Sequence, residues 1–433
     1  MERERPGSTM PRRQAGFTLV EMLVALAITI VLLLAVLAAF DLNSRMTKVQ
    51  TNVADMQQSS RIAQDDLVRL LRMAGRGGLP LVRPDPRPPV VPAPNRLITQ
   101  GVAVAVQDNV PDNQRMVAGD PATLILPGTD VLTVRGVFST LYRVRITDPL
   151  ELNPPANPTS GRVLLRSAPI PNGPAQDLQP LLEALRRRSE PLLLVSSFSD
   201  AVYVMVNSGD VAWIETKKVG EEETEPALAV DFTVPVPGRL SSREDNGFPA
   251  DLKSAAFLGI LEEHRYYIRE DHAIANDRGS DLAPKLARAR FVPGTNQPYQ
   301  DDPNNARLDL ADNVLDLQVA LGFDSPNAGG SRASDLDNDG SDDQIVETAD
   351  GKNDDWLLNS TSDGVVVTGM GPLQYLRVTT VVRTDRRDFK YQAPLLPDRI
   401  EDRAYPANDP LNSPSARMFR WRQMRTVVDL RNL

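Results

Sequence analysis

A run of almost entirely apolar residues lies near the start of the chain. It covers 24 residues, 17–40, and its only polar members are Thr18, Glu21 and Thr29. At 1.5 Å per residue, a helix of this length spans about 36 Å, which is enough to cross the hydrocarbon core of a bilayer. The pattern therefore predicts a helix that crosses a membrane once.

The residues before this run are polar and end in a glycine. Arg12 and Arg13 lie directly before the apolar stretch, and Gly16 is the last residue of the polar segment. Positive charge next to a membrane helix favours the cytoplasmic side. We therefore expect the N-terminus in the cytoplasm and the bulk of the chain in the periplasm.

Glu21 is the one acidic residue in the apolar run. A carboxylate in an apolar environment costs several kcal/mol unless it finds a partner, and we expect no partner nearby in an uncut chain. If the chain is cut after Gly16, the new α-amine of Phe17 lies four residues, one helical turn, from Glu21. Cleavage would thus create the positive charge that Glu21 needs as a partner, and the presence of Glu21 in the apolar run in turn supports cleavage at this position.

The helix is predicted to continue beyond the apolar run. From residue 42 onward apolar or small residues recur at alternating spacings of four and three, which places one narrow stripe along a helix. Gly75, Gly77 and Gly78 predict its end, so residues 17–74 form a helix of about 87 Å. Packing against a globular domain and a coiled coil with another chain both fit this stripe. The stripe consists of Leu42, Met46, Val49, Val53, Met56, Ser60, Ala63, Leu67, Leu70 and Ala74.

The remaining chain reads as a linker followed by a β-rich domain. Residues 75–96 are rich in Gly and Pro and predict a stiff connector. Residues 97–433 mostly alternate with a period of two, which is typical of strands. The predicted fold class is α+β: a long N-terminal helix against a mainly antiparallel sheet domain. Strands are expected near residues 102–106, 130–134, 201–206, 229–236, 375–383 and 424–430, and short helices over 176–188 and 251–263.

The composition limits the kinds of bond, metal site and binding partner that we expect for this chain. The chain contains no cysteine and two histidines, which excludes disulfides and disfavours a zinc site. The net charge of −9 argues against nucleic-acid binding through a basic surface, and the basic stretch 417–425 is interpreted as a terminal strand. We find no catalytic constellation and expect a protein that is not an enzyme.

The segment Gly16–Ile28, GFTLVEMLVALAI, closely resembles the type IV prepilin signature. The resemblance implies that prepilin peptidase removes the leader 1–16, cuts between Gly16 and Phe17 and methylates Phe17. It also implies that Glu21 sets the register between filament subunits. An uncleaved signal anchor is the alternative interpretation.

Three further segments are similar to PilW-type minor pilins. They are residues 128–134, residues 310–319 and the C-terminal Val428–Leu433. The resemblance implies a minor pilin that is stored in the inner membrane, in contact with its lipid. It then joins other pilins and minor pilins in a pilus on the cell surface, and supports assembly or priming. A J-like pseudopilin of type II secretion and a membrane-anchored domain that never polymerises remain alternatives.

A separate acidic loop has the spacing of a calcium ligand set. Residues 335–343 read DLDNDGSDD. Carboxylates at alternating positions can converge on Ca²⁺, with a glycine for the turn and a main-chain carbonyl as a further ligand. The twelfth position of an EF-hand loop is Val346 here instead of Glu, so we expect a calcium loop without EF-hand structure. The candidate ligands are Asp335, Asp337, Asp339, Ser341 and Asp343.

Overall fold

The protein is represented by a computed structural model, which divides into two compact units, Met1–Asp55 and Met56–Leu433. The structure describes residues 18–81, 103–170, 172–196, 202–217, 224–234, 240–242, 248–249, 252, 254–272, 282–299, 307–323, 344–345, 355–358 and 373–430.

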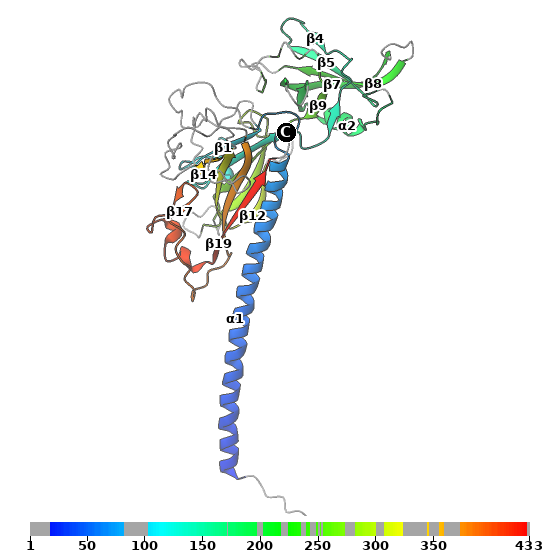
Figure 1. Cartoon of the computed structure of the whole chain (residues 1–433). Coiled ribbons are helices and arrows are strands. Elements are labelled where there is room, and N and C mark those ends of the chain that lie inside the picture. Colours follow the sequence, from blue (N-terminus) through cyan, green and yellow to red (C-terminus); the bar gives the residue numbers. More distant parts are fainter. Residues whose placement is uncertain are drawn as a thin grey trace, which may run out of the picture. The chain divides into compact units, whose positions relative to one another are not determined.

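A single long helix, α1, covers Leu19–Arg72 and belongs to both units (Figure 1). Over residues 19–40 of the first unit it is apolar apart from Glu21 and Thr29, and in the second unit it buries one stripe. The helix is followed by a turn in which Gly75 has a φ of 75°. A Cβ atom there would lie 2.9 Å from the carbonyl oxygen of Leu79, so this turn requires glycine.

One sheet of the second unit has the order β1-β2-β10-β11-β12 and is antiparallel throughout. Its interior apolar cluster includes Ile125, Val131, Tyr267 and Phe291. The strands are β1 (Val104–Gln107), β2 (Val131–Gly136), β10 (Glu262–Arg269), β11 (Lys285–Phe291) and β12 (Leu308–Asp312).

A second antiparallel sheet has the order β14-β15-β13-β16-β19. The residues between β16 and β19 include a small hairpin and two 3₁₀ turns, and part of this segment packs on the sheet through Leu396, Ile400 and Tyr405. The strands are β13 (Val314–Phe323), β14 (Gln344–Ile345), β15 (Asp355–Leu358), β16 (Leu373–Arg383) and β19 (Trp421–Asp429). The hairpin is β17 (Arg399–Ile400) with β18 (Arg403–Ala404), and the 3₁₀ turns η2 and η3 are Pro410–Asn412 and Ala416–Met418.

The third sheet has seven antiparallel strands in the order β3-β9-β6-β7-β8-β5-β4. The short helix α2 (Gln179–Arg187) buries Leu181, Leu182 and Leu185 in the same core as this sheet. The strands are β3 (Leu141–Arg143), β4 (Glu151–Asn153), β5 (Ser160–Arg166), β6 (Pro191–Val195), β7 (Tyr203–Lys217), β8 (Thr224–Thr233) and β9 (Phe257–Ile260). A 3₁₀ turn, η1 (Pro121–Thr123), precedes β2.

The α+β prediction is confirmed, and so is α2, but the helix predicted over residues 251–263 is wrong. These residues contain β9 and the start of β10. Leu258 in β9 and Leu261 between the two strands are both fully buried, so this segment lacks the alternation that distinguishes strands from helices. A Cβ atom at Gly259 would lie 2.5 Å from Val137, so β9 lies directly against that residue.

Candidate functional site

The described part of the N-terminal motif begins at Thr18, so the predicted cleavage residues Gly16 and Phe17 lie outside it. The Thr18 N–H and hydroxyl both donate to Glu21 Oε2 at 2.9 Å. In return, the Glu21 N–H donates to Thr18 Oγ1 at 3.3 Å. This reciprocal pair is a capping box, which satisfies donors that a helix start leaves without partners.

The expectation that Glu21 has no partner in an uncut chain is therefore wrong. The T-x-x-E spacing at the start of α1 was visible in the sequence and predicts this contact. Thr18 supplies hydrogen bonds from neutral groups, however, and adds no positive charge beside Glu21. A cation near this charge, such as a free α-amine, is still the stronger partner in an apolar medium.

The first unit exposes a mostly apolar stretch of α1, residues 19–40, in which Glu21 and Thr29 are the polar residues. Every residue from Thr18 to Lys48 is exposed, including Leu19, Val31 and Phe40 at 76%, 66% and 67% of their full areas. Among the described residues, α1 is the one helix long and apolar enough to cross a membrane. An apolar surface of this extent is stable only when lipid or other protein covers it.

In the second unit the predicted stripe of α1 is buried from Met56 onward. Together with the stripe residues, Leu71 is fully buried, while Leu42 and Met46 of the same stripe are exposed in the first unit. The stripe thus packs against its own domain only in the last turns of the helix. The buried helix residues are Met56, Ser60, Ala63, Leu67, Leu70 and Leu71.

A polar contact accompanies this apolar stripe. Asp66 accepts hydrogen bonds from Arg288 Nη1 at 2.8 Å and from the Tyr266 hydroxyl at 2.9 Å. Burial, followed by the negative charge of Asp66, raises the pKa of Tyr266 well above its usual value. Tyr266 and Arg288 belong to the neighbouring strands β10 and β11, so Asp66 fixes α1 to that sheet.

Two of the segments that resemble PilW-type minor pilins touch each other. The Asp130 N–H donates to the Leu317 carbonyl at 2.9 Å, and the Val319 N–H donates to Asp130 Oδ2 at 2.8 Å. Gln318 also donates to the Gly128 carbonyl at 3.0 Å. These two short segments, almost 190 residues apart, therefore form one buried junction between the two five-stranded sheets.

The junction continues into the hairpin β17–β18. Asp316 accepts from Arg403 at 2.9 Å and from the Tyr405 hydroxyl, and it is fully buried. Burial raises the pKa of Asp316, whereas Arg403 and the hydrogen bonds lower it. The geometry identifies these residues as structural: their polar atoms bind each other across the fold.

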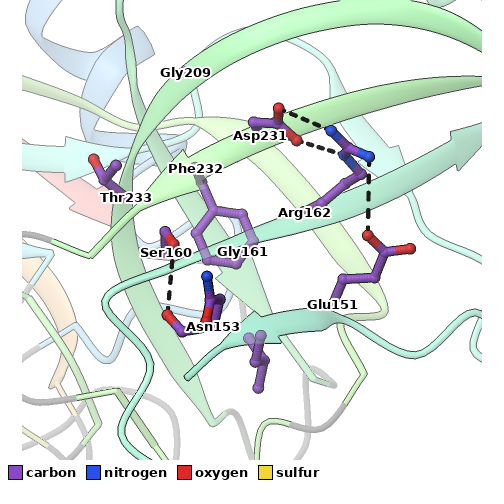
Figure 2. Close-up of a pocket in the computed structure, with 10 residues that line it drawn as sticks. Glu151, Asn153, Ser160, Gly161, Arg162, Gly209, Asp231, Phe232 and Thr233 are labelled. Carbon is purple, nitrogen blue, oxygen red and sulfur yellow. Dashed lines mark hydrogen bonds and ion pairs between the residues drawn. The ribbon is translucent and has the colours of Figure 1, made fainter. Parts of the chain in front are cut away.

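A pocket of about 510 Å³ lies over β4, β5, β7 and β8 (Figure 2). Arg162 pairs with Asp231 at 2.5 Å and lies 4.0 Å from Glu151, so two other lining residues compensate the positive charge of Arg162. Within the described residues lining it, the pocket presents no nucleophile paired with a base. The lining residues are Glu151, Leu152, Asn153, Ser160, Gly161, Arg162, Gly209, Asp231, Phe232 and Thr233.

The predicted calcium ligands, Asp335 to Asp343, lie outside the described residues. Within the part of the chain that is described, no group of three or more His, Asp or Glu side chains is arranged to hold a metal ion. The calcium loop therefore stays a prediction.

Comparison with known proteins gives one finding at the N-terminus. Residues 11–37 match the family model described as the prokaryotic N-terminal methylation motif. The match supports a type IV pilin-like or pseudopilin-like protein that prepilin peptidase processes and that assembles with pilins in general. Together with the apolar helix, it supports membrane anchoring followed by assembly. Neither the curated proteins nor the solved structures contain a match to this chain.

Proposed function

We propose that this chain is a PilW-like minor pilin, a structural subunit without enzymatic activity that supports pilus assembly or priming. It is stored in the inner membrane with its sheet domain in the periplasm and then enters a type IV pilus. The observation that carries the proposal is the exposed apolar half of α1, with Glu21 one turn inside it and the methylation motif around it.

The prepilin motif alone is common to pili and to type II secretion machines. The contact between residues 128–130 and 316–319 favours the minor pilin, because two separate resemblances to PilW-type proteins fall on one junction of the fold. Deleting the gene should abolish or reduce piliation and leave type II secretion intact. Loss of secretion with normal pili would favour the J-like pseudopilin.

N-terminal mass spectrometry of the native protein tests the proposal most directly. The mature chain should begin at Phe17 and carry a methylated α-amine. Gly16→Ala should leave the precursor uncut in the membrane when the matching peptidase is present. A native chain that still begins at Met1 contradicts both filament functions.

Glu21→Ala separates processing from assembly. We expect the variant to be cut normally, because the scissile bond is unchanged, but to enter filaments poorly, because it lacks the charge that pairs with a neighbouring α-amine. Thr18→Ala serves as the matched control, since it removes the hydroxyl contacts of the capping box and keeps the charge of Glu21. Equal assembly by Glu21→Ala and the native chain rules out the register role.

A further inference from the structure

Two segments of the second unit, residues 385–391 after β16 and residues 417–422 leading into β19, lie side by side. The Asp388 N–H donates to the Met418 carbonyl at 2.8 Å, and the Arg420 side chain donates to Asp388 at 3.1 Å. Together the segments contain six basic and two acidic side chains, a net charge of +4 in a chain whose net charge is −9. They therefore form one basic patch. Its basic residues are Arg386, Arg387, Lys390, Arg417, Arg420 and Arg422.

Part of the positive charge of the basic patch is on exposed side chains. Lys390 and Arg422 are exposed, and neither forms an ion pair with a residue that the structure describes. The Arg386 side chain is 81% exposed and lies 3.9 Å from Asp385, which is 75% exposed, so water screens this pair strongly. These three cations are therefore accessible to an anionic partner.

An aromatic side chain projects from the middle of the basic patch. Phe389 is 79% exposed, more than any other large apolar side chain in the described part of the chain. Tyr391 lies close by, with the Arg420 guanidinium 3.8 Å from the centre of its ring. Aromatic rings beside basic side chains are typical of surfaces that contact lipid, because the ring enters the interface while the cations bind the headgroups.

The basic patch lies at the end of the second unit where α1 enters. The turn after α1 lies at the opposite end, because the Gly75 N–H donates to the Arg135 carbonyl, beside the start of β10. β10 ends, β11 begins and β12 ends on the same side of their sheet. β13 begins directly after β12, next to the end of β16 and the start of β19. In agreement with this order, Ser60, near the start of the unit, contacts Met424 of β19 (Figure 1).

α1 connects this end of the domain to the apolar stretch 19–40. The connection is residues 41–55, about 22 Å of helix, so the domain stays tethered near lipid headgroups once the apolar stretch lies in a bilayer. Anionic lipids attract clusters of Lys and Arg close to their surface. We propose that the basic patch binds anionic phospholipid headgroups of the membrane that α1 spans, with the Phe389 ring inserted among them. The proposal rests on the membrane anchor of the proposed function and is independent of entry into a filament.

The full chain in lipid nanodiscs tests this contact. Because the chain contains no cysteine, Gln392→Cys provides a single thiol for a fluorescent label at an exposed position beside the basic patch. A lipid with a quencher on its headgroup should quench the label more strongly in discs that contain phosphatidylglycerol than in discs of phosphatidylcholine. The difference should disappear at high salt, which screens the charges. Lys390→Gln with Arg422→Gln should weaken the contact about 25-fold, since each basic residue contributes about fivefold.

Arg186→Gln with Arg187→Gln is the matched control, because it makes the same charge change at exposed positions of α2, and it should leave the quenching unchanged. Phe389→Ser should reduce the quenching without any change in charge. Equal quenching in the two kinds of disc overturns the proposal and leaves the membrane anchor intact, whereas a chain that does not enter the discs overturns both. If duplex DNA shields the label and phosphatidylglycerol has no effect, the patch binds nucleic acid and the lipid proposal is wrong.

Discussion

Asp66 is a charged residue through which α1 is held to the interior strands β10 and β11. Its side chain is 16% exposed and that of Arg288 is 18% exposed, so water screens the pair only partly. The apolar stripe predicted the face of the helix that packs, but a carboxylate beside that stripe looks in the sequence like any solvated helix position. Its partners are more than 190 residues away and become neighbours only when β10 and β11 pair.

Asp66→Ala should therefore destabilise the domain. The change leaves Arg288 partly buried without its carboxylate, and hydrogen bonds to charged groups contribute about 1.5–3 kcal/mol each. We expect a lower melting temperature of the full chain in detergent. Asp65→Ala, at an exposed position of the same helix, is the control and should leave the melting temperature nearly unchanged.

A larger loss of stability is expected when a buried group of three charged residues is broken. Arg135 of β2 and Glu263 and Arg265 of β10 form this group. Glu263 accepts from Arg135 at 2.6 Å and from Arg265 at 2.7 Å, and the side chains of Arg135 and Glu263 are fully buried. Both arginines lower the pKa of Glu263 against the effect of burial. The sequence did not predict this triad: Glu263 was expected in a helix over 251–263, and nothing in the spacing of Arg135, Glu263 and Arg265 indicates that they meet inside the core.

Glu263→Gln removes the charge that compensates two buried guanidinium groups. Breaking a buried ion pair from one side costs about 3–5 kcal/mol, so the variant should fold poorly or melt at a much lower temperature. Asp231→Asn breaks the ion pair between Asp231 and Arg162. The two side chains are 36% and 41% exposed, respectively, so the change should cost less than about 1 kcal/mol. Similar losses of stability in the two variants would contradict the conclusion that the buried charge of Glu263 contributes more than the exposed charge of Asp231.

At the scale of elements, α1 was the most predictable part of the chain. Its apolar run, its stripe and its terminal glycines each have a simple helical period or a simple end signal, and the helix Leu19–Arg72 follows them. β9 and the start of β10 were mistaken for a helix, because a strand buried on both faces carries apolar residues without alternation. Sheet order was also beyond the sequence, since pairs such as β2 with β10 depend on long-range contacts.

The stripe gives a prediction with an internal control. Leu67→Ala opens a cavity where α1 meets the sheets, and such truncations of buried leucines cost about 2–5 kcal/mol. Leu42→Ala removes the same group from the same stripe at a position that is 61% exposed in the first unit. We expect thermal unfolding in detergent to shift strongly for Leu67→Ala and little for Leu42→Ala. Equal shifts show that the stripe packs alike in both halves.

At the scale of the whole molecule, a chain without cysteine has no disulfide to stabilise it, so the periplasmic domain proposed above depends on its core or on a metal. Apolar cores and buried ion networks account for the described sheets. We expect a metal at the acidic segment 335–343, which lies outside the described residues. Several acids at such close spacing repel one another in the absence of a cation, and the repulsion falls when a cation binds.

We propose that this loop binds Ca²⁺ through Asp335, Asp337, Asp339, the Ser341 carbonyl and Asp343. Carboxylate and carbonyl oxygens at these positions are the ligands that calcium prefers. Isothermal titration of the full chain in detergent should give a saturable heat with Ca²⁺, which Asp337→Ala removes. Asp210→Ala, which changes an exposed acid in β7, should leave the titration unchanged.

The Ca²⁺-loaded native chain should also melt at a higher temperature than the metal-free chain, because a ligand that binds only the folded state stabilises it. A titration without heat above background, together with an unchanged melting temperature, leaves the acids of this loop as solvated surface charge.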